Sequence, residues 1–361
     1  MRKKNHLLTV MALMAGLGLF LCCCDDCPTC PKPQAPVLGH YRIYAFDGLQ
    51  GLLMSIDTPA DTVVDSVRVD YYGSFIYVTP DGQRLLVMNV GDSGNKLEIY
   101  NTSDLAHVGT LNQYGFYYFD GSDNYGICAL GSIRFIDPIS LLPIDTINRS
   151  VRSGYLDTVS NLFLAAAASS ATIYKIDCIT RTLVDSFTNM FGGNVTNLAY
   201  NRLTNDIYYF TFIGSYYSYF VQYDCDGDSV IDKTVVTQTT GGISITPDCR
   251  RVYMTDGGNG MLGTIPQGQI WVFDALTNRV LTWIPNYNIA TGRRLVPLFG
   301  QVVITPDNNR AYLGAARSSG GPIPMPVIDL NTNQIIKTVF SDTLNGNIGA
   351  MTVAIGPVPK K

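Results

Sequence analysis

The densest group of potential metal ligands in the chain is a short acidic segment. Its carboxylates occupy positions 1, 3, 5 and 9 of a possible calcium loop, at Asp224, Asp226, Asp228 and Asp232. Position 6 is Ser229 instead of the glycine such loops use, and position 12 is Val235 instead of a bidentate glutamate. A weak surface calcium site is one interpretation, and a plain turn between two strands is the one that we favour.

Other catalytic chemistry has few candidate residues. The chain has three histidines, and His6 lies in an N-terminal apolar stretch, so only His40 and His107 remain. Two histidines cannot form the clustered sites of histidine-dependent metalloenzymes. The pair Cys27 and Cys30 is followed by Pro31, where covalent haem attachment would need histidine. We therefore expect no catalytic residues, no enzymatic activity and no cofactor beyond the calcium alternative.

Four further cysteines lie in the body of the chain. Cys128 sits in an apolar run and is predicted to be a buried thiol. Cys225 and Cys249 each lie in a predicted turn, so a disulfide between them is an open alternative in an oxidising compartment. Cys27 and Cys30 are predicted to form a local disulfide or to have no role.

The elements that would position these residues follow a repeat. Seven times an apolar run ends in Asp or Asn, and seven residues later lies another apolar run. These anchor residues, 36 to 55 positions apart, are Asp57, Asn101, Asp137, Asp177, Asp224, Asp274 and Asp329. That spacing is typical of a four-stranded propeller blade. The residues one and four places before each anchor are apolar and point to opposite faces of a strand, which predicts sheets buried on both faces.

A second signature marks three predicted hairpin turns. It reads Thr-Pro-Asp with an arginine three residues after the aspartate, and it begins at Thr79, Thr246 and Thr305. Proline presets the backbone for the second position of a type I turn. We place these turns between the two inner strands of their blades.

The residues after these arginines resemble a known family. Leu86-Val87-Met88-Asn89, Tyr253-Met254-Thr255-Asp256 and Tyr312-Leu313-Gly314-Ala315 are similar to the Tyr-Val-Thr-Asn motif of YVTN (YncE-like) β-propeller proteins. The resemblance covers most of residues 40–357 and is strongest in three blades. It implies a seven-bladed propeller, commonly extracytoplasmic, and it carries no shared catalytic constellation.

The two ends of this region are predicted to close the ring. Residues 40–69 have room for three strands, and Met351 to Ile355 form an unpaired strand near the C-terminus. This last strand would complete the first blade and remove an exposed sheet edge. The expected fold is all-β, a seven-bladed propeller over residues 40–357 with a tail at 358–361.

The N-terminus has the pattern of a secretory signal. Basic residues 2–4 precede an uncharged stretch from Leu7 to Cys24, and Leu21-Cys22-Cys23-Cys24 resembles the lipobox of bacterial lipoproteins. Cys24 fits best as the lipidated residue, with Cys22 and Cys23 as alternatives. We expect a signal over residues 1–23 and a Cys/Pro-rich tether over residues 24–39. An uncleaved anchor and simple secretion remain alternatives.

The charge balance excludes one class of partner. Removing residues 1–23 takes away three basic residues and no acidic ones, which leaves 22 basic against 29 acidic residues, a balance of −7. An acidic chain without a basic cluster is unsuited to nucleic acid.

Three long connections suggest where a partner binds. They are Gly257 to Gly268, Asn286 to Pro297 and Gly314 to Pro324, assigned here to the fifth and sixth blades and expected on one face. Arg293, Arg294 and Arg317 lie in them and could meet an anionic group. The aromatic stretches Tyr114 to Phe119 and Tyr216 to Phe220 are expected to be mainly packing residues.

These observations favour a lipid-anchored binding protein of the bacterial cell envelope. Its partner would be a protein, peptide or glycan, and its contact with the membrane would be through the N-terminal lipid. The alternative is a periplasmic propeller enzyme, a hydrolase or an oxidoreductase, with its site in the central channel.

Overall fold

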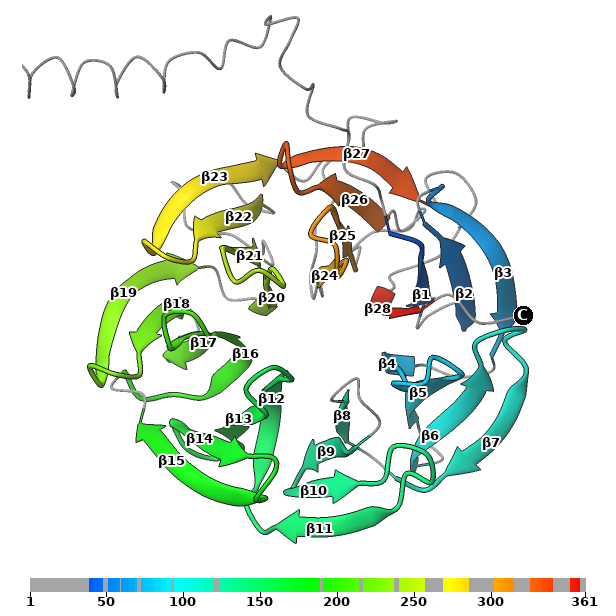
Figure 1. Cartoon of the computed structure of the whole chain (residues 1–361), viewed down its shortest axis with the longest axis horizontal. Coiled ribbons are helices and arrows are strands. Elements are labelled where there is room, and N and C mark those ends of the chain that lie inside the picture. The colour runs from blue at the N-terminus through cyan, green and yellow to red at the C-terminus, as the bar shows by residue number, and fades with distance from the viewer. Residues whose placement is uncertain are drawn as a thin grey trace, which may run out of the picture. The chain divides into compact units, whose positions relative to one another are not determined.

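The computed structural model describes residues 39–357, apart from 48–50, 59, 70–72, 92–93, 114, 120–123, 189–190, 214–216, 237–239, 257–268, 286–301, 315–324 and 340–350. The described residues form 28 strands and no helix, in seven antiparallel sheets of four strands. The sheets stand as blades around a central axis (Figure 1). No helix among the described residues could span a membrane. The fold is the expected seven-bladed β-propeller.

Each blade runs from an innermost strand to an exposed outer strand. Blade one contains β28 (Met351–Pro357), β1 (Tyr41–Asp47), β2 (Leu52–Asp57) and β3 (Thr62–Arg68). Blades two and three contain β4 (Gly73–Val78), β5 (Arg84–Gly91), β6 (Gly94–Asn101), β7 (His107–Leu111), β8 (Phe116–Phe119), β9 (Gly126–Leu130), β10 (Ser132–Ile136) and β11 (Pro143–Ile147). Blades four and five contain β12 (Val151–Asp157), β13 (Leu162–Ala167), β14 (Thr172–Asp177), β15 (Thr182–Thr188), β16 (Val195–Asn201), β17 (Asp206–Ile213), β18 (Tyr217–Asp224) and β19 (Ser229–Val236). Blades six and seven contain β20 (Thr240–Ile245), β21 (Arg251–Asp256), β22 (Gln269–Asp274), β23 (Arg279–Pro285), β24 (Val302–Ile304), β25 (Arg310–Leu313), β26 (Met325–Asp329) and β27 (Gln334–Val339).

The core is divided among seven interfaces between neighbouring blades. The residue one place before each anchor packs on the preceding blade, as Ile176 does in the cluster shared by blades three and four. The residue four places before packs on the following blade, as Ile173 does in the cluster shared by blades four and five. All fourteen such residues are buried. The predicted burial of both sheet faces is confirmed, because each blade is covered on both sides.

The apolar residue seven places after each anchor has a different environment. It lies on the outer strand, and 43% to 53% of its surface is exposed in every blade. These residues are Val64, Val108, Ile144, Val184, Ile231, Leu281 and Ile336. Their branched or aliphatic side chains suit the extended backbone of an outer strand. This part of the repeat therefore reflects strand propensity and not a buried core.

The anchor turns share one geometry. In five blades the Oδ1 atom of the anchor aspartate accepts backbone N–H groups two and three residues later, as Asp177 does from Ile179 (2.9 Å) and Thr180 (2.8 Å). The residue four places after every anchor has a positive φ of 47° to 59°. A left-handed residue after such a turn produces the bulge that begins each outer strand. The fixed seven-residue spacing is therefore a requirement of this turn.

The Thr-Pro-Asp turns join the first and second strands of their blades, as predicted. The threonine Oγ1 accepts the backbone N–H of the arginine at 2.9–3.0 Å in all three copies. The arginine then reaches the next blade: Arg84 Nη1 donates to the Ile139 carbonyl oxygen at 2.8 Å, and Arg251 donates to that of Leu330. Each signature arginine therefore fastens its blade to the following one.

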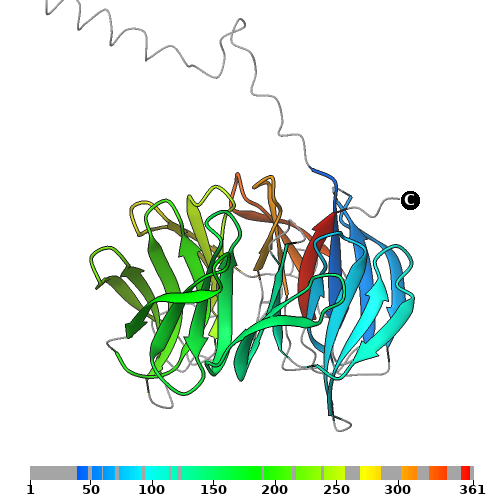
Figure 2. The same cartoon turned by 60° about the horizontal axis from the view of Figure 1, so that its bottom comes forward.

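The two faces of the ring differ in their connections. The turn face, uppermost in Figure 2, carries the turns between first and second and between third and fourth strands. The loop face carries the connections between second and third strands and the links between blades. Strand order assigns the three long connections to blades six and seven, which corrects the fifth and sixth assigned from sequence. The error was one of counting, since the first blade already contains the first anchor. The three connections leave and re-enter strands on the loop face, as expected.

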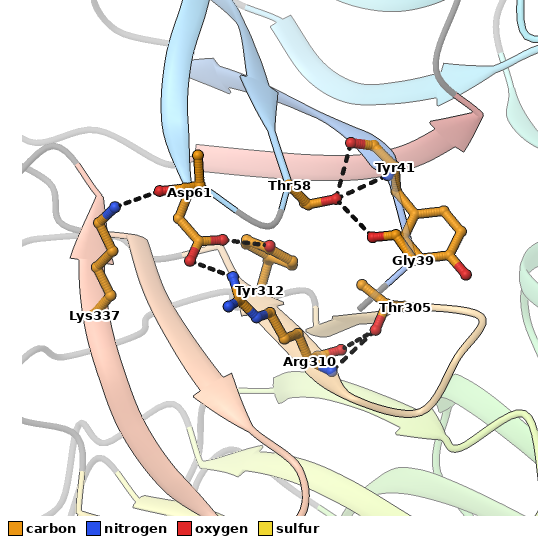
Figure 3. Close-up of polar contacts among 9 residues, drawn as sticks. Gly39, Tyr41, Thr58, Asp61, Thr305, Arg310, Tyr312 and Lys337 are labelled. Atoms are coloured by element: carbon orange, nitrogen blue, oxygen red, sulfur yellow. Dashed lines mark hydrogen bonds and ion pairs between the residues drawn. The ribbon is translucent and has the colours of Figure 1, made fainter. Parts of the chain in front are cut away.

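The ring closes between blade seven and blade one. The C-terminal strand β28 pairs with β1 over seven residue pairs, from Tyr41 with Pro357 to Asp47 with Met351. On the turn face, Asp61 accepts hydrogen bonds from Tyr312 (2.6 Å) and from Arg310, and both partners belong to blade seven (Figure 3). Tyr208 and Tyr253 make the equivalent bonds to Asn278 (2.9 Å) and Asn333 (2.7 Å) at the two preceding interfaces. At the closing interface, the carboxylate of Asp61 therefore accepts the bond that the neutral amides of Asn278 and Asn333 accept at the two preceding interfaces.

Candidate functional site: the central cavity

A cavity of about 730 Å³ occupies the axis of the ring. The innermost strand of every blade contributes to its wall. Each of these strands is paired on one side only, so its other edge presents backbone groups toward the axis. This volume lies within the range of small-molecule binding sites, roughly 300–1,000 Å³.

The wall of the cavity has two chemically different halves. Blades two to four supply partly buried aromatic side chains, which are Phe75 and Tyr77 of β4, Phe116 and Tyr118 of β8, and Tyr155 of β12. Blades five, six, seven and one supply no aromatic residue; β16, β20, β24 and β28 contribute aliphatic residues, a glycine and the polar residues Thr196, Asn197 and Ser244. A flat ligand would therefore find aromatic surface on one side only.

Irregular strand pairing shapes the loop-face end of the cavity. The pairing of the innermost strand with its neighbour is broken by a bulge in blades two, four, five and six. In blade four the extra residue is Arg152, and in blade five it is Asn197, whose φ is +49°. Both residues line the cavity. A bulge adds one residue and redirects its side chain, which explains how these polar groups reach the axis.

Arg152 is the one charged residue among the described residues of this wall. Among the seven described innermost strands it is the only basic residue, and Asp157 at the other end of β12 is the only acidic one. Asp157 lies at the turn-face end and pairs with Arg202 at 3.7 Å. No ion pair among the described residues includes Arg152, and its buried Nε has no hydrogen-bond partner there. Burial lowers the pKa of Arg152 below its usual value, because no carboxylate compensates its lost hydration.

Two hydroxyl groups of cavity-lining residues also lack partners among the described residues. Ser153 Oγ, which follows Arg152 in β12, and Thr196 Oγ1 of the neighbouring β16 are both buried and unbonded. Buried polar atoms in folded proteins are normally satisfied by protein, water or ligand. The wall of the cavity therefore holds a guanidinium and two hydroxyl groups whose hydrogen-bonding capacity is not used among the described residues.

The aromatic half is held rigidly. The Tyr118 hydroxyl of blade three accepts the backbone N–H of Gly154 in blade four at 2.9 Å. A Cβ at Gly154 would lie 2.4 Å from the ring of Phe163, so only glycine fits at this point of β12. The Phe75 and Phe116 rings meet edge to face, with centroids 5.0 Å apart. These contacts fix the aromatic half relative to Arg152.

The acidic segment forms a turn between β18 and β19, which is the interpretation favoured from the sequence, with the weak calcium site as its alternative. Asp224 accepts the turn N–H groups, Asp226 accepts a hydrogen bond from Asn205 (2.5 Å), and Asp228 accepts one from Tyr223. Asp232 lies on the outer strand β19 and accepts the N–H of Lys233 at 2.7 Å. In the part of the chain that the structure describes, no three His, Cys, Asp or Glu side chains are grouped to hold a metal ion. The structure does not bring these four carboxylates together.

The remaining histidines and cysteines are dispersed. His40 pairs with Asp57 at 2.9 Å and His107 with Glu98 at 2.6 Å, far apart in the chain. Cys128 is buried, as predicted. The disulfide alternative for Cys225 and Cys249 is wrong, since both are free thiols.

The two thiols fail to meet because their turns place them at different interfaces. Cys225 packs against the cluster between blades four and five, whereas buried Cys249 follows Asp248 in the left-handed position of a Thr-Pro-Asp turn in blade six. Burial raises the pKa of the Cys225 thiol to about 12. Neither thiol is therefore a reactive thiolate.

Several predicted residues lie outside the described part of the chain. These are the lipidation candidates Cys22, Cys23 and Cys24, the pair Cys27 and Cys30, and the arginines Arg293, Arg294 and Arg317. Of the aromatic stretches, residues 116–119 line the cavity, and Phe220 is buried between blades five and six. The sequence reasoning missed Arg152. The sequence feature that could have identified it is a lone arginine near the start of an innermost strand.

Comparison with known proteins supports the fold. No family model matches the chain, and no curated protein matches it. Among solved structures, a functionally unknown protein from Desulfotomaculum acetoxidans has a TM-score of 0.61 at 14% identity, over 86% of this chain and 99% of that one. Hydrazine synthase from Kuenenia stuttgartiensis gives 0.56 at 14% identity, over 73% of this chain and 79% of that one. Apo AztD from Citrobacter koseri gives 0.53 at 10% identity, over 89% of this chain and 100% of that one. At these identities the likeness extends to the fold alone: the chain is a seven-bladed β-propeller.

Proposed function

We propose that the chain is a lipid-anchored, extracytoplasmic propeller of the bacterial cell envelope that binds a protein, peptide or glycan through its loop face. The proposal includes membership of the YVTN (YncE-like) group, whose motif the sequence resembles. It treats the molecule as a binding scaffold and not as an enzyme. The observation that carries it is the position at which the chain enters the ring.

The chain enters on the turn face. The Gly39 N–H donates to Asp307 Oδ2 of a Thr-Pro-Asp turn at 2.7 Å, and His40 contacts Asp57 of the first anchor turn. Any anchor before residue 39 is therefore attached through the turn face. The loop face, with Arg152 and the strand ends that carry the three long connections, lies on the opposite side of the ring from residue 39, which supports its use for a partner.

The chemistry of the cavity also favours binding over a hydrolase or oxidoreductase. Its described wall residues include one arginine and no His, Cys, Asp, Glu or Lys. General acid–base catalysis needs a group that exchanges a proton near neutral pH, and arginine stays protonated there. Arg152 can orient and stabilise an anion, which suits recognition.

Lipidation is the first expected result. The apolar stretch before Leu21 to Cys24 should direct cleavage before Cys24 and acylation of its thiol. Mass spectrometry of the membrane fraction should find an acylated N-terminal cysteine, most readily Cys24. Recovery of a soluble mature protein with an unmodified N-terminus would remove the anchoring part of the proposal.

The second expected result concerns the loop face. Replacing Arg293, Arg294 and Arg317 together with alanine should weaken binding of an anionic peptide or glycan about tenfold or more, and should reduce the salt dependence of binding. Exposed substitutions change stability by only about 0.5 kcal/mol, so the fold should survive. Binding can be measured on arrays of such ligands at two salt concentrations.

The matched control lies on the opposite face. Shortening the turn Asp224 to Asp228 should leave affinity unchanged, because this turn belongs to the turn face. If a partner still binds after the triple substitution but no longer binds when the Asp224 turn is changed, its binding site lies on the turn face. This result would contradict the proposed loop-face site.

A further inference from the structure

We propose that the central cavity binds an aromatic carboxylate, with the carboxylate on Arg152 and the ring system against the aromatic half of the wall. This inference rests on the proposed binding function and names the ligand class that the cavity accepts. Three features of the cavity carry it: the one charged side chain among its described wall residues, its one-sided aromatic wall and the arrangement of the two along β12.

The charge sets the head group of the ligand. Arg152 has no carboxylate partner among the described residues, and its Nε is buried without a hydrogen bond. A planar guanidinium matches a carboxylate through two parallel hydrogen bonds. Ser153 and Thr196 of the same wall add two hydroxyl groups that have no partner among the described residues. Because no second basic residue lies on the described innermost strands, a single carboxylate fits better than a polyanion.

The wall sets the body of the ligand. Phe75, Tyr77, Phe116, Tyr118 and Tyr155 all line the cavity, and each is only partly buried. These rings also pack between blades, so a ligand can contact only the part of each ring that stays exposed; an aromatic contact is worth about 0.5–1.5 kcal/mol beyond the area buried. The opposite wall of β20, β24 and β28 is mainly aliphatic, and the cavity of about 730 Å³ between the walls has room for a flat ring system.

The positions along β12 set the length of the ligand. Arg152 lies at the loop-face end of the strand, and Tyr155 lies three residues further toward the turn face. Three residues of strand span about 10 Å. The carboxylate would therefore sit near the loop-face mouth and the rings deeper in the cavity. Two fused rings bearing one carboxylate match this arrangement.

The test uses 2-naphthoate and its neutral counterpart 2-naphthamide, titrated by calorimetry into the purified full-length protein. We expect 2-naphthoate to bind at least tenfold more tightly than the amide. The Arg152→Met variant should lose about 10- to 100-fold in affinity for 2-naphthoate and little for the amide, since hydrogen bonds to charged groups are the stronger ones. Phe75→Leu should weaken both ligands about 2- to 10-fold.

Arg149→Met is the matched control. Arg149 is an exposed arginine in the link before β12, outside the cavity wall, where it lies 5.6 Å from the centre of the Tyr174 ring. This variant removes the same charge from the same segment and should bind 2-naphthoate like the wild type. Circular dichroism and melting temperature of each variant report whether the ring is intact.

The outcomes separate this inference from the proposed function. Equal affinity for the two ligands, equal loss in Arg149→Met and Arg152→Met, or no binding of 2-naphthoate at about millimolar concentration would overturn the cavity assignment. Partner binding that still depends on Arg293, Arg294 and Arg317 would then leave the scaffold proposal standing. Chromatographic recovery of a chemically altered 2-naphthoate would instead overturn the non-enzymatic function and leave the cavity assignment in place.

Discussion

Deletion of residues 350–361 should lower the melting temperature sharply, whereas deletion of residues 358–361 alone should leave it nearly unchanged. The longer deletion removes β28, which supplies the innermost strand of blade one and seven residue pairs with β1. It also removes Ile355 from the interface of blades seven and one, and Ala354 from the interface of blades one and two. Strand β1 would be left as an open edge facing the axis.

The expected loss in free energy of unfolding exceeds the roughly 2–5 kcal/mol that truncating one core side chain costs, because a whole strand and parts of two interfaces disappear together. Thermal unfolding followed by circular dichroism measures it. The shorter deletion is the matched control, since it keeps β28 complete. A melting temperature that is equal in the two deletions would mean that the ring does not depend on β28 for closure.

Replacing Asp61 with alanine should be the most destabilising single substitution on the turn face. Asp61 and the Arg310 side chain are 3% and 13% exposed, and Tyr312 is fully buried (Figure 3). Burial and the hydrogen bond to Asp61 raise the pKa of Tyr312, so this tyrosine stays a neutral donor. Removing the acceptor leaves a partly buried guanidinium and a buried hydroxyl without their partner, which costs about 3–5 kcal/mol.

The structure supplies matched controls for this substitution. Asn333→Ala removes the equivalent neutral contact to Tyr253 and should cost about 1–3 kcal/mol. Asp61→Asn keeps an acceptor for Tyr312 and removes the charge that pairs with Arg310. Its loss in free energy of unfolding should therefore fall between those of Asn333→Ala and Asp61→Ala. Urea unfolding of the three variants gives these values. An Asp61→Ala variant that is no less stable than Asn333→Ala would show that the charged contact adds nothing to closure.

The repeat predicted the ring because its physical causes are local. A left-handed residue four places after each anchor fixes the turn length, and apolar residues one and four places before each anchor fix which faces are buried. Both features recur in every blade, including the blades whose Thr-Pro-Asp signature is incomplete. The unpaired segment near Met351 likewise predicted closure, since an odd strand at one end matches a missing strand at the other.

The cavity was not predictable in the same way. Arg152 reaches the axis because a bulge in β12 adds one residue, and the nearby glycine, Gly154, could equally mark a close approach, such as its contact with Phe163. The disulfide alternative was wrong for a related reason. Cys225 and Cys249 both lie in turns on the same face of the ring, but these turns do not place them at the same blade interface. The arginines of the long connections lie outside the described residues, and their role stays a prediction.

The most direct test of the account is hydrogen–deuterium exchange of the full-length protein with and without 2-naphthoate. The innermost strands have one unpaired edge each, so their amide protons report what occupies the axis. The account predicts slower exchange in β4, β8, β12 and the start of β16, with no change in the Asp224 turn, and loss of this protection in Arg152→Met. Protection confined to the turn face, or unaltered by Arg152→Met, would contradict it.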